Sequence, residues 1–206
     1  MLFPVRCKGC RKPRHGVCDS CIHRIPHATD LPKHMYAVFD YGNTIIQRSI
    51  RELKYYRHSE ATKALCLSGL PYIVEHISDQ LQSHHSHQLI FVPVPTHHKR
   101  VQERGFNQSL LIAQWWSSAL SASCVLPCLK KTTQTLPQAT LNRKFRLQNV
   151  KNSMICTKTL NHKNIYVIVD DVITTGATCD EAHRALYTAG ARKIHIVALA
   201  HGYARK

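Results

Sequence analysis

One short segment near the end of the chain combines acidic, hydroxyl and glycine residues at a spacing that suits phosphate binding. Two adjacent carboxylates, Asp170 and Asp171, directly follow the apolar run from 165 to 169. A turn-forming run then leads into a helical stretch, and it consists of Thr174, Thr175, Gly176, Ala177 and Thr178. Because backbone N–H groups and the positive end of a helix dipole converge at such a turn, we predict that it binds a phosphate.

The acidic pair narrows the class of ligand. Two carboxylates would repel a bare phosphate, so the ligand must also carry hydroxyl groups or a cation. A ribose 5-phosphate meets this requirement, since its 2- and 3-hydroxyls can donate hydrogen bonds to Asp170 and Asp171. Residues that merely cap a helix would account for one or two members of the segment, but not for the acidic pair and the full loop together.

A metal centre is predicted near the N-terminus. Cys7-x-x-Cys10 and Cys18-x-x-Cys21 supply four thiolates, and each pair has the spacing that grips one side of a tetrahedral zinc ion. Four protein ligands leave no open position on the metal, so we predict structural Zn²⁺ rather than a catalytic ion. A redox dithiol and an iron-sulfur cluster are the alternatives.

The last third of the chain contains the elements that must position the acidic pair. Residues 165–169 are predicted to form a buried strand, 178–189 a helix closed by Gly190, and 194–199 another strand. Strand, helix and strand at this spacing form a parallel βαβ unit, so the expected fold class is α/β. In an open parallel sheet, ligands bind at the carboxyl ends of the strands, where the acidic pair is expected.

The preceding part of the chain supplies the other expected elements. Strands are predicted at 37–41, 89–92, 125–129 and 153–157, and helices at 46–54, 59–82 and 107–120. Pro93 and Pro95 end the second strand, Pro71 is expected to bend the long helix, and Asn107 can cap the last helix.

The length of 206 residues suits one main domain with a small appendage. We place the boundary near Asp30, which gives a four-cysteine module at 1–30 and the main domain at 31–206. The segment from Cys7 to Cys21 is short, polar and basic with almost nothing to pack, so it is predicted to need a metal or a partner to fold.

The charge balance points to a polyanionic partner. Lys and Arg number 28 against 12 Asp and Glu, a formal net charge of +16, and no acidic residue lies between Arg104 and Val169. This basic stretch either lines an anion site or forms a basic outer face, and a merely basic surface is the simplest alternative. The chain contains no apolar run long enough to span a bilayer and no signal-peptide core, so we expect a cytoplasmic protein.

The segment 169–178 resembles the signature of type I phosphoribosyltransferases that binds 5-phosphoribosyl-1-pyrophosphate (PRPP). Three further features narrow the resemblance to the ComF family, which is associated with natural competence and DNA uptake in bacteria. The first is the paired C-x-x-C, and the second is a P-V-P turn at 93–95 followed by Lys99, Arg100 and the R-G-F-N-Q run at 104–108. The third is a pattern formed by Gln138, Leu141, Arg146, Asn149 and Val150.

The resemblance implies a type I phosphoribosyltransferase-like parallel sheet flanked by helices, with a small N-terminal zinc ribbon. It also implies that the turn containing Pro93 and Val94 binds the pyrophosphate of PRPP. Lys99, Arg100 and Arg104 lie close behind this turn and can neutralise a diphosphate, although surface charges that cap a helix are an alternative.

The long basic segment from Thr132 to Asn149 suits a mobile cover that closes over the ligand and excludes water. A plain surface loop is the alternative. If the segment closes, Gln138, Arg146 and Asn149 are the residues to test first.

Two functions follow from these observations. We favour an enzyme that transfers phosphoribose from PRPP to an acceptor with Mg²⁺, with Asp170, Asp171 and Arg104 as catalytic residues. The metal would be held by PRPP oxygens together with one of the two aspartates.

The alternative is a non-catalytic protein that senses PRPP or holds single-stranded DNA, and that works with other proteins of the competence machinery. Basic residues with interspersed Tyr55, Tyr56, Phe106 and Phe145 could track a phosphate backbone and stack bases. Aromatic residues in the core or under covered surface are the competing interpretation.

Overall fold

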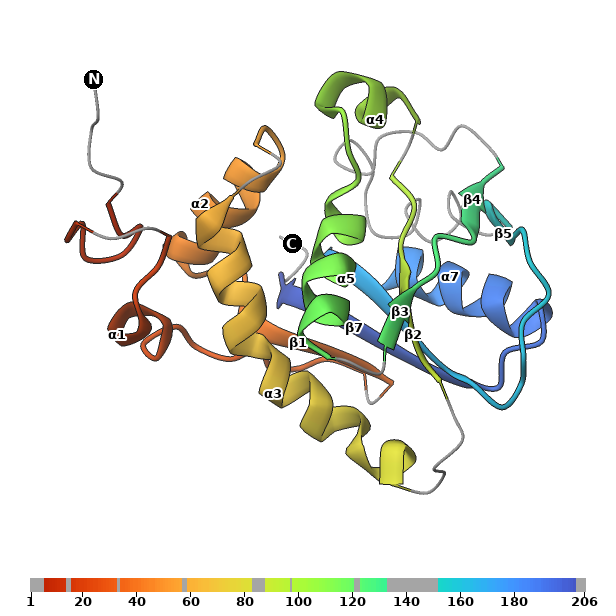
Figure 1. The fold of residues 1–206 in the computed structure, drawn as a ribbon. Helices are drawn as coiled ribbons and strands as arrows, with labels where there is room; N and C mark the ends of the chain where they lie inside the picture. Colours follow the sequence, from red (N-terminus) through yellow and green to blue (C-terminus); the bar gives the residue numbers. More distant parts are fainter. Residues whose placement is uncertain are drawn as a thin grey trace.

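A five-stranded sheet forms the centre of the protein in the computed structural model (Figure 1). Its strands are β1 (Met35–Asp40), β2 (Leu89–Pro93), β3 (Ser123–Val125), β6 (Ile165–Ile173) and β7 (Lys193–His201). They lie in the order β1-β7-β6-β2-β3, and every neighbouring pair is parallel. The predicted α/β fold with a parallel sheet is therefore confirmed.

The structure describes residues 6–13, 16–32, 34–56, 59–82, 88–96, 98–120, 123–132 and 152–202, with backbone only at 79–82 and 98–100.

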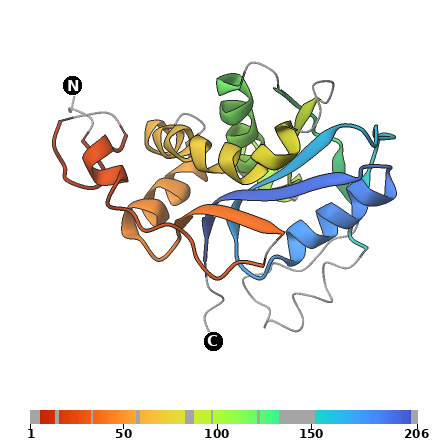
Figure 2. The ribbon, with the colours of Figure 1, turned by 90° about the horizontal axis from the view of Figure 1, so that it is seen from below.

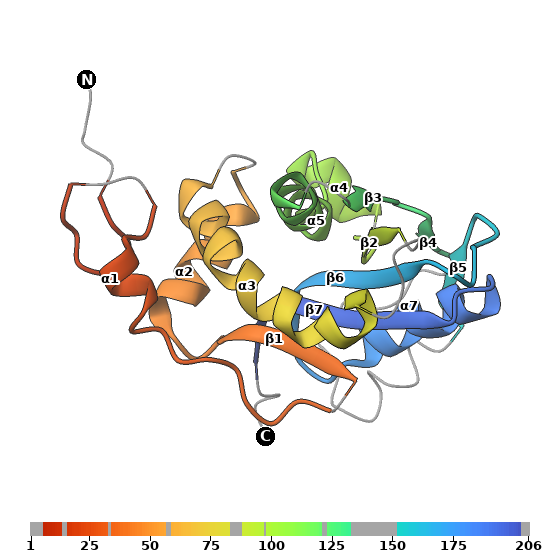
Figure 3. The ribbon, with the colours of Figure 1, turned by 60° about the horizontal axis from the view of Figure 1, so that its bottom comes forward.

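Helices cover both faces of the sheet (Figures 1 and 3). The helices α3 (Glu60–Gln82) and α5 (Gln108–Ala119) pack on one face, and α7 (Ala177–Thr188) packs on the other. Along β6, Val167 and Val169 belong to the same core cluster as Trp116 of α5, whereas Ile168 packs in a second cluster with Leu186 of α7. Alternate residues of the strand thus face two apolar layers, as expected for a parallel sheet buried on both sides.

The strand β6 is longer than predicted. It was expected to end at Val169, but it continues to Ile173, so Asp170 and Asp171 lie within the strand rather than after it. The neighbouring strand β7 is equally long, and it pairs with β6 as far as Ile173 opposite His201. This ladder of backbone hydrogen bonds overrides the low strand propensity of aspartate.

The predicted strand at 125–129 is wrong. The chain leaves β3 after Val125 and enters β4 (Leu129–Lys131), which pairs antiparallel with β5 (Met154–Cys156) in a separate two-stranded sheet. Pro127 lies between β3 and β4, and its missing N–H prevents one continuous strand. The predicted strand at 153–157 is confirmed by β5 to within one residue at each end.

The predicted helices are confirmed within one or two residues of their ends. The helix α2 (Thr44–Leu53) follows β1, α3 continues through Pro71, and Asn107 caps α5. Two short helices, α1 (Asp19–Ile22) and α4 (His98–Arg104), were not predicted. In the part of the chain that the structure describes, no helix combines the length and hydropathy needed to cross a membrane.

The cysteine-rich N-terminal segment packs against the main sheet domain. Figure 2 shows it beside α2 and α3 at one end of the sheet. Val17 and Ile22 are buried in the same core cluster as Ile46 and Ile50 of α2. The Lys8 ammonium lies 2.7 Å from the carboxylate of Glu52, which is another residue of α2. The segment therefore buries more apolar surface than its sequence suggested, and the domain boundary near Asp30 stays a prediction.

Candidate functional site at the carboxyl edge of the sheet

Two predicted parts of the ligand site meet at the carboxyl ends of β2 and β6. Pro93, the last residue of β2, lies opposite Val169 in the sheet register, one residue before the acidic pair. The Val94 N–H donates a hydrogen bond to the Val169 carbonyl at 2.9 Å. Pro93 and Asp170 are 77 positions apart in the sequence. The structure brings the Pro93–Val94 turn beside Asp170 because β2 and β6 are neighbouring strands.

The predicted phosphate turn connects β6 to α7. Gly176 is the N-cap of α7 and has a φ of 79°, a left-handed conformation that strains any residue with a side chain. A Cβ atom at this position would lie 2.7 Å from Met35 Cε, so the site also lacks room for one. The backbone N–H groups of the first turn of α7 can therefore face an anion at this edge. Thr174 is exposed, and Thr175 and Thr178 are partly exposed.

The Asp170 carboxyl group is held by several donors. Its Oδ1 accepts hydrogen bonds from the Ser109 hydroxyl at 3.0 Å and from the Asp171 N–H at 2.9 Å. Its Oδ2 lies 3.9 Å from the Cys179 thiol, which donates to it. Burial, followed by the negative charge of Asp171, raises the pKa of Asp170 to about 7, although the hydrogen bonds from the Asp171 N–H and the Ser109 hydroxyl oppose the shift. A ligand hydroxyl or a cation at this carboxylate would relieve the cost of ionising it.

The basic residues near the turn lie on α4. The guanidinium group of Arg104, the last residue of α4, is partly buried and donates to Gln108 Oε1 at 3.5 Å. Lys99 and Arg100 belong to the first turns of α4, but their side chains lie outside the described residues. The predicted covering residues Gln138, Arg146 and Asn149 also lie outside the described residues.

Ser109 was not predicted as a site residue. Ser109 is buried, together with Ile112, Ala113 and Trp116, on the face of α5 that packs against the sheet. A serine on an otherwise apolar helical stripe needs a polar partner, and this pattern could have indicated one. The partner is Asp170.

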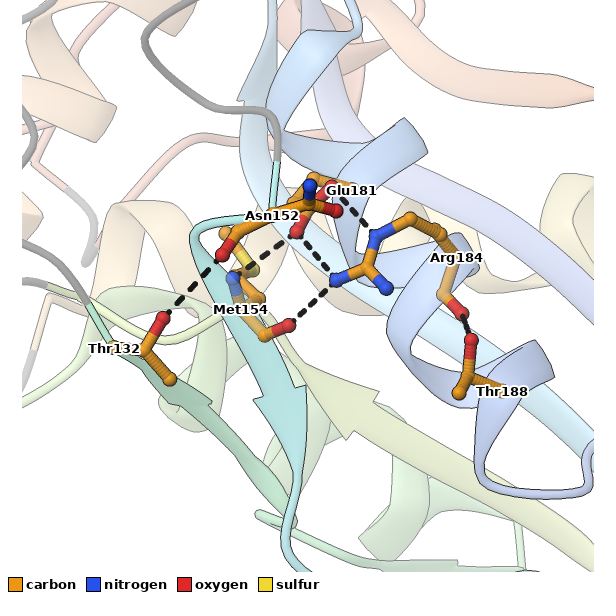
Figure 4. A network of polar contacts seen from close by, with 6 residues as sticks. All are labelled: Thr132, Asn152, Met154, Glu181, Arg184 and Thr188. Carbon is orange, nitrogen blue, oxygen red and sulfur yellow. Dashed lines mark hydrogen bonds and ion pairs between the residues drawn. The ribbon is translucent and has the colours of Figure 1, made fainter.

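A polar network involves α7 and the described residues on either side of the predicted covering segment (Figure 4). Thr132 Oγ1 donates to the Asn152 carbonyl at 3.5 Å; Thr132 is the first residue of the segment, and Asn152 lies three positions after its last. The buried carboxylate of Glu181 accepts from the Met154 N–H at 3.1 Å and from Arg184 at 2.7 and 2.9 Å. Arg184 also donates to the Met154 carbonyl at 2.8 Å. The helix that begins at the predicted phosphate turn therefore also anchors β5.

The four N-terminal cysteines form a cluster that could bind a metal such as zinc. The Sγ atoms of Cys7, Cys10, Cys18 and Cys21 all lie within 4.8 Å of one another. The Sγ atom of Cys18 lies 3.6 Å from that of Cys7 and 3.8 Å from that of Cys10. A tetrahedral ion with Zn–S bonds of about 2.3 Å requires S···S separations of about 3.8 Å, so the cluster fits zinc.

Backbone N–H groups favour the thiolate form of Cys7. Its Sγ accepts from the N–H groups of Gly9 and Cys18, each at 3.4 Å. Burial raises the pKa of the Cys7 thiol, but these backbone hydrogen bonds and one from Cys10 outweigh it and lower the pKa to about 6. Zinc binds the thiolate form of cysteine, so the local backbone suits a metal ligand.

Comparison with known proteins adds relatives over most of the chain. No protein-family model matches the sequence. Competence protein F of Haemophilus influenzae is 36% identical over 121 residues, which cover 56% of this chain and 53% of that protein. DNA utilization protein YhgH of Escherichia coli K12 is 30% identical over 194 residues, which cover 92% of this chain and 81% of that protein. The protein of the same name from Salmonella typhi is 28% identical over 191 residues, which cover 87% of this chain and 75% of that protein.

Proposed function

This chain belongs to the ComF family, whose members include proteins named for competence and for DNA utilization, and from this premise we propose that it binds PRPP or a close relative. We propose further that it transfers the phosphoribosyl group to an acceptor in a process linked to DNA uptake. Binding would take place at the carboxyl edge of the sheet, between the β2 turn and the start of α7.

One observation carries the proposal. The strand β6 presents Asp170 and Asp171 at the carboxyl edge, and the chain then turns through Gly176 directly into α7. Carboxylates that can accept hydrogen bonds from a ribose diol thus lie a few residues before a helix N-terminus that can bind its 5-phosphate. The adjacent Pro93–Val94 turn supplies a second backbone segment for the pyrophosphate group of the same ligand.

The proposed reaction breaks the bond between C1 of the ribose and the pyrophosphate oxygen. The bonding electrons leave with pyrophosphate, and the acceptor forms the new bond to C1. Asp170 and Asp171 would hold the ribose hydroxyls and face the positive charge that develops on the sugar. Arg104 would lie on the pyrophosphate side, where a guanidinium group can bind the leaving group. Mg²⁺, bound with the ligand, would neutralise part of the pyrophosphate charge.

We propose that the cysteine cluster holds structural Zn²⁺. The four thiolates would complete a tetrahedral shell and leave no position for a substrate. The ion would then stabilise the fold of the N-terminal segment rather than take part in the reaction.

Release of pyrophosphate from PRPP tests transfer directly. The assay uses the full chain with Mg²⁺ and a panel of bases, amines and oligonucleotides as acceptors. Acceptor-dependent release that is lost in Asp170→Asn would support the enzyme. Tight binding of Mg²⁺-PRPP without release by any acceptor would contradict transfer and favour a sensor.

A second candidate function is binding of single-stranded DNA. Tyr55 and Tyr56, which directly follow the C-cap of α2, have exposed fractions of 73% and 65%. Arg48 and Arg51 are exposed on the same helix, and Lys54 caps its end. Exposed rings beside cations can stack on bases while the cations contact phosphates.

This second candidate predicts binding that weakens steeply with salt. Fluorescence anisotropy with a labelled oligonucleotide should show a loss of affinity when both Tyr55 and Tyr56 are changed to alanine. Tyr187→Ala is the matched control, because this tyrosine is also exposed but lies on α7, away from α2 in Figures 1 and 3. Equal affinity in the double variant, or no detectable binding at low salt, would argue against the second candidate.

A further inference from the structure

Asn107 connects the start of α5 to the turn after β2. Its side-chain Nδ2 donates to the Val94 carbonyl at 2.9 Å. Its Oδ1 accepts from the Thr96 hydroxyl at 2.9 Å and from the Ser109 N–H at 3.0 Å. One amide side chain therefore caps α5 and holds the β2 turn at two points.

Ser109 continues this connection to the acidic pair. Its N–H is bound by Asn107, and its hydroxyl donates to Asp170 Oδ1 at 3.0 Å. Ser109 has an exposed fraction of 4%, so water competes little for the hydrogen bond. A continuous chain of hydrogen bonds thus runs from Val94 through Asn107 and Ser109 to Asp170.

We propose that Asn107 and Ser109 are positioning residues that fix the β2 turn and the Asp170 carboxylate in one relative geometry. This inference rests on the proposed function, in which the two ends of the chain of hydrogen bonds bind the two halves of one ligand. Neither side chain needs to touch that ligand. Asn107 acts through the Val94 carbonyl, and Ser109 acts through the carboxylate of Asp170.

The physical reason is that a ligand with two anionic groups binds tightly only when both subsites are held at the right separation. If one subsite moves, each half of the ligand can still bind alone, but the joined ligand must deform the protein to reach both. Loss of a positioning residue therefore weakens the joined ligand more than its halves. A residue that serves only the stability of the fold has no reason to produce this difference.

Three variants of the full chain test the inference. Asn107→Ser keeps a side-chain acceptor for the cap of α5 but loses the amide donor to Val94. Ser109→Ala removes only the hydroxyl, and Ser109→Thr retains it. Ser118→Ala is the matched control, because Ser118 is an exposed serine on the same helix. Calorimetry then measures affinity for Mg²⁺-PRPP, for ribose 5-phosphate and for Mg²⁺-pyrophosphate.

Asn107→Ser and Ser109→Ala are each expected to bind Mg²⁺-PRPP about tenfold more weakly, the effect expected for the loss of one intramolecular hydrogen bond. Asn107→Ser should bind ribose 5-phosphate and Mg²⁺-pyrophosphate within about threefold of wild type. Ser109→Thr and Ser118→Ala should bind Mg²⁺-PRPP as wild type does.

Two results would overturn the inference while leaving the proposed function intact. One is wild-type affinity for Mg²⁺-PRPP in both Asn107→Ser and Ser109→Ala. The other is an equal loss for PRPP and for its separate halves in Asn107→Ser, which would indicate local damage. Failure of the wild-type protein to bind Mg²⁺-PRPP would instead reject the proposed function and the inference with it.

Discussion

Arg184 and Glu181, less than one turn apart on α7, form an ion pair at 2.7 Å, and both also bind the backbone of Met154 in β5. The pair joins the helix that follows the phosphate turn to the strand that follows the predicted covering segment (Figure 4). It is thus a structural link between two parts of the proposed site that are distant in sequence.

Removal of Arg184 should destabilise the protein. Arg184→Ala leaves the buried Glu181 carboxylate with fewer donors, and we expect the free energy of unfolding to fall by about 2 kcal/mol. Denaturant titration measures the change. Arg192→Ala is the control, because Arg192 is exposed and lies over the Tyr187 ring at 4.5 Å, a contact that contributes about 0.5–1 kcal/mol at an exposed site. Equal losses in the two variants would contradict the assigned role.

The raised pKa of Asp170 predicts a pH-dependent stability. Its pKa rises from 3.8 to about 7 in the folded protein, so the folded state holds this proton more tightly than the unfolded chain. The stability that this shift gives the folded protein is fully present below the pKa of Asp170 in the unfolded chain, and it is lost as the pH rises through the folded pKa of about 7. Asp170→Asn cannot ionise and should escape this loss.

Stability measured at pH 5 and pH 8 without added Mg²⁺ tests this prediction. When the pH is raised from 5 to 8, the free energy of unfolding of Asp170→Asn should increase relative to that of wild type by on the order of 2 kcal/mol. Titrating groups that do not interact with Asp170 are common to both proteins and cancel in the comparison. A constant difference across this range would show that the folded protein does not raise the pKa of Asp170.

Two glycines allow a matched test of the phosphate turn. Gly176 and Gly105 have nearly equal φ values of 79° and 77°, but only Gly176 has neighbours in the place of a Cβ atom. Gly105→Ala should cost about 1 kcal/mol of backbone strain. Gly176→Ala should cost more and should weaken binding of ribose 5-phosphate, and its cost should be smaller when it is measured in a Met35→Ala background, which lacks the contacting side chain. Equal costs at the two glycines would show that Met35 does not restrict the turn.

Metal analysis tests the cysteine cluster. We expect one Zn²⁺ per chain, and Cys10→Ser should lose the metal and lower the midpoint of thermal unfolding, because the ion stabilises the N-terminal segment. Cys124→Ser is the control, since Cys124 lies in β3 outside the cluster. Zinc content that is unchanged in Cys10→Ser, or zinc that is absent from the wild-type protein, would contradict the assignment.

The parallel sheet and the position of the candidate site at its carboxyl edge could be predicted from the sequence because both depend on local patterns. The apolar run at 165–169 and the helix after Gly176 are visible without tertiary information. The extension of β6 to Ile173 depends on pairing with β7, and α4 has a single apolar residue, Val101, on which periodicity could be recognised. Such features follow from tertiary context, which overrides local propensity.

The chain of hydrogen bonds from Val94 to Asp170 was also beyond sequence reasoning. The capping role of Asn107 was predicted because it is local, but its bond to Val94 crosses 13 positions. The bond from Ser109 to Asp170 crosses 61 positions and requires α5 to pack on β6. In the sequence, only the placement of Ser109 on an otherwise apolar helical stripe indicates that it needs a polar partner.

The most direct measurement is calorimetric binding of Mg²⁺-PRPP to the wild-type protein and to the variant with both Asp170 and Asp171 changed to asparagine. Wild type should bind, the double variant should show no measurable binding, and Asp19→Asn, a change in the distant α1, should bind as wild type does. Equal binding by the double variant would contradict the assignment of the site.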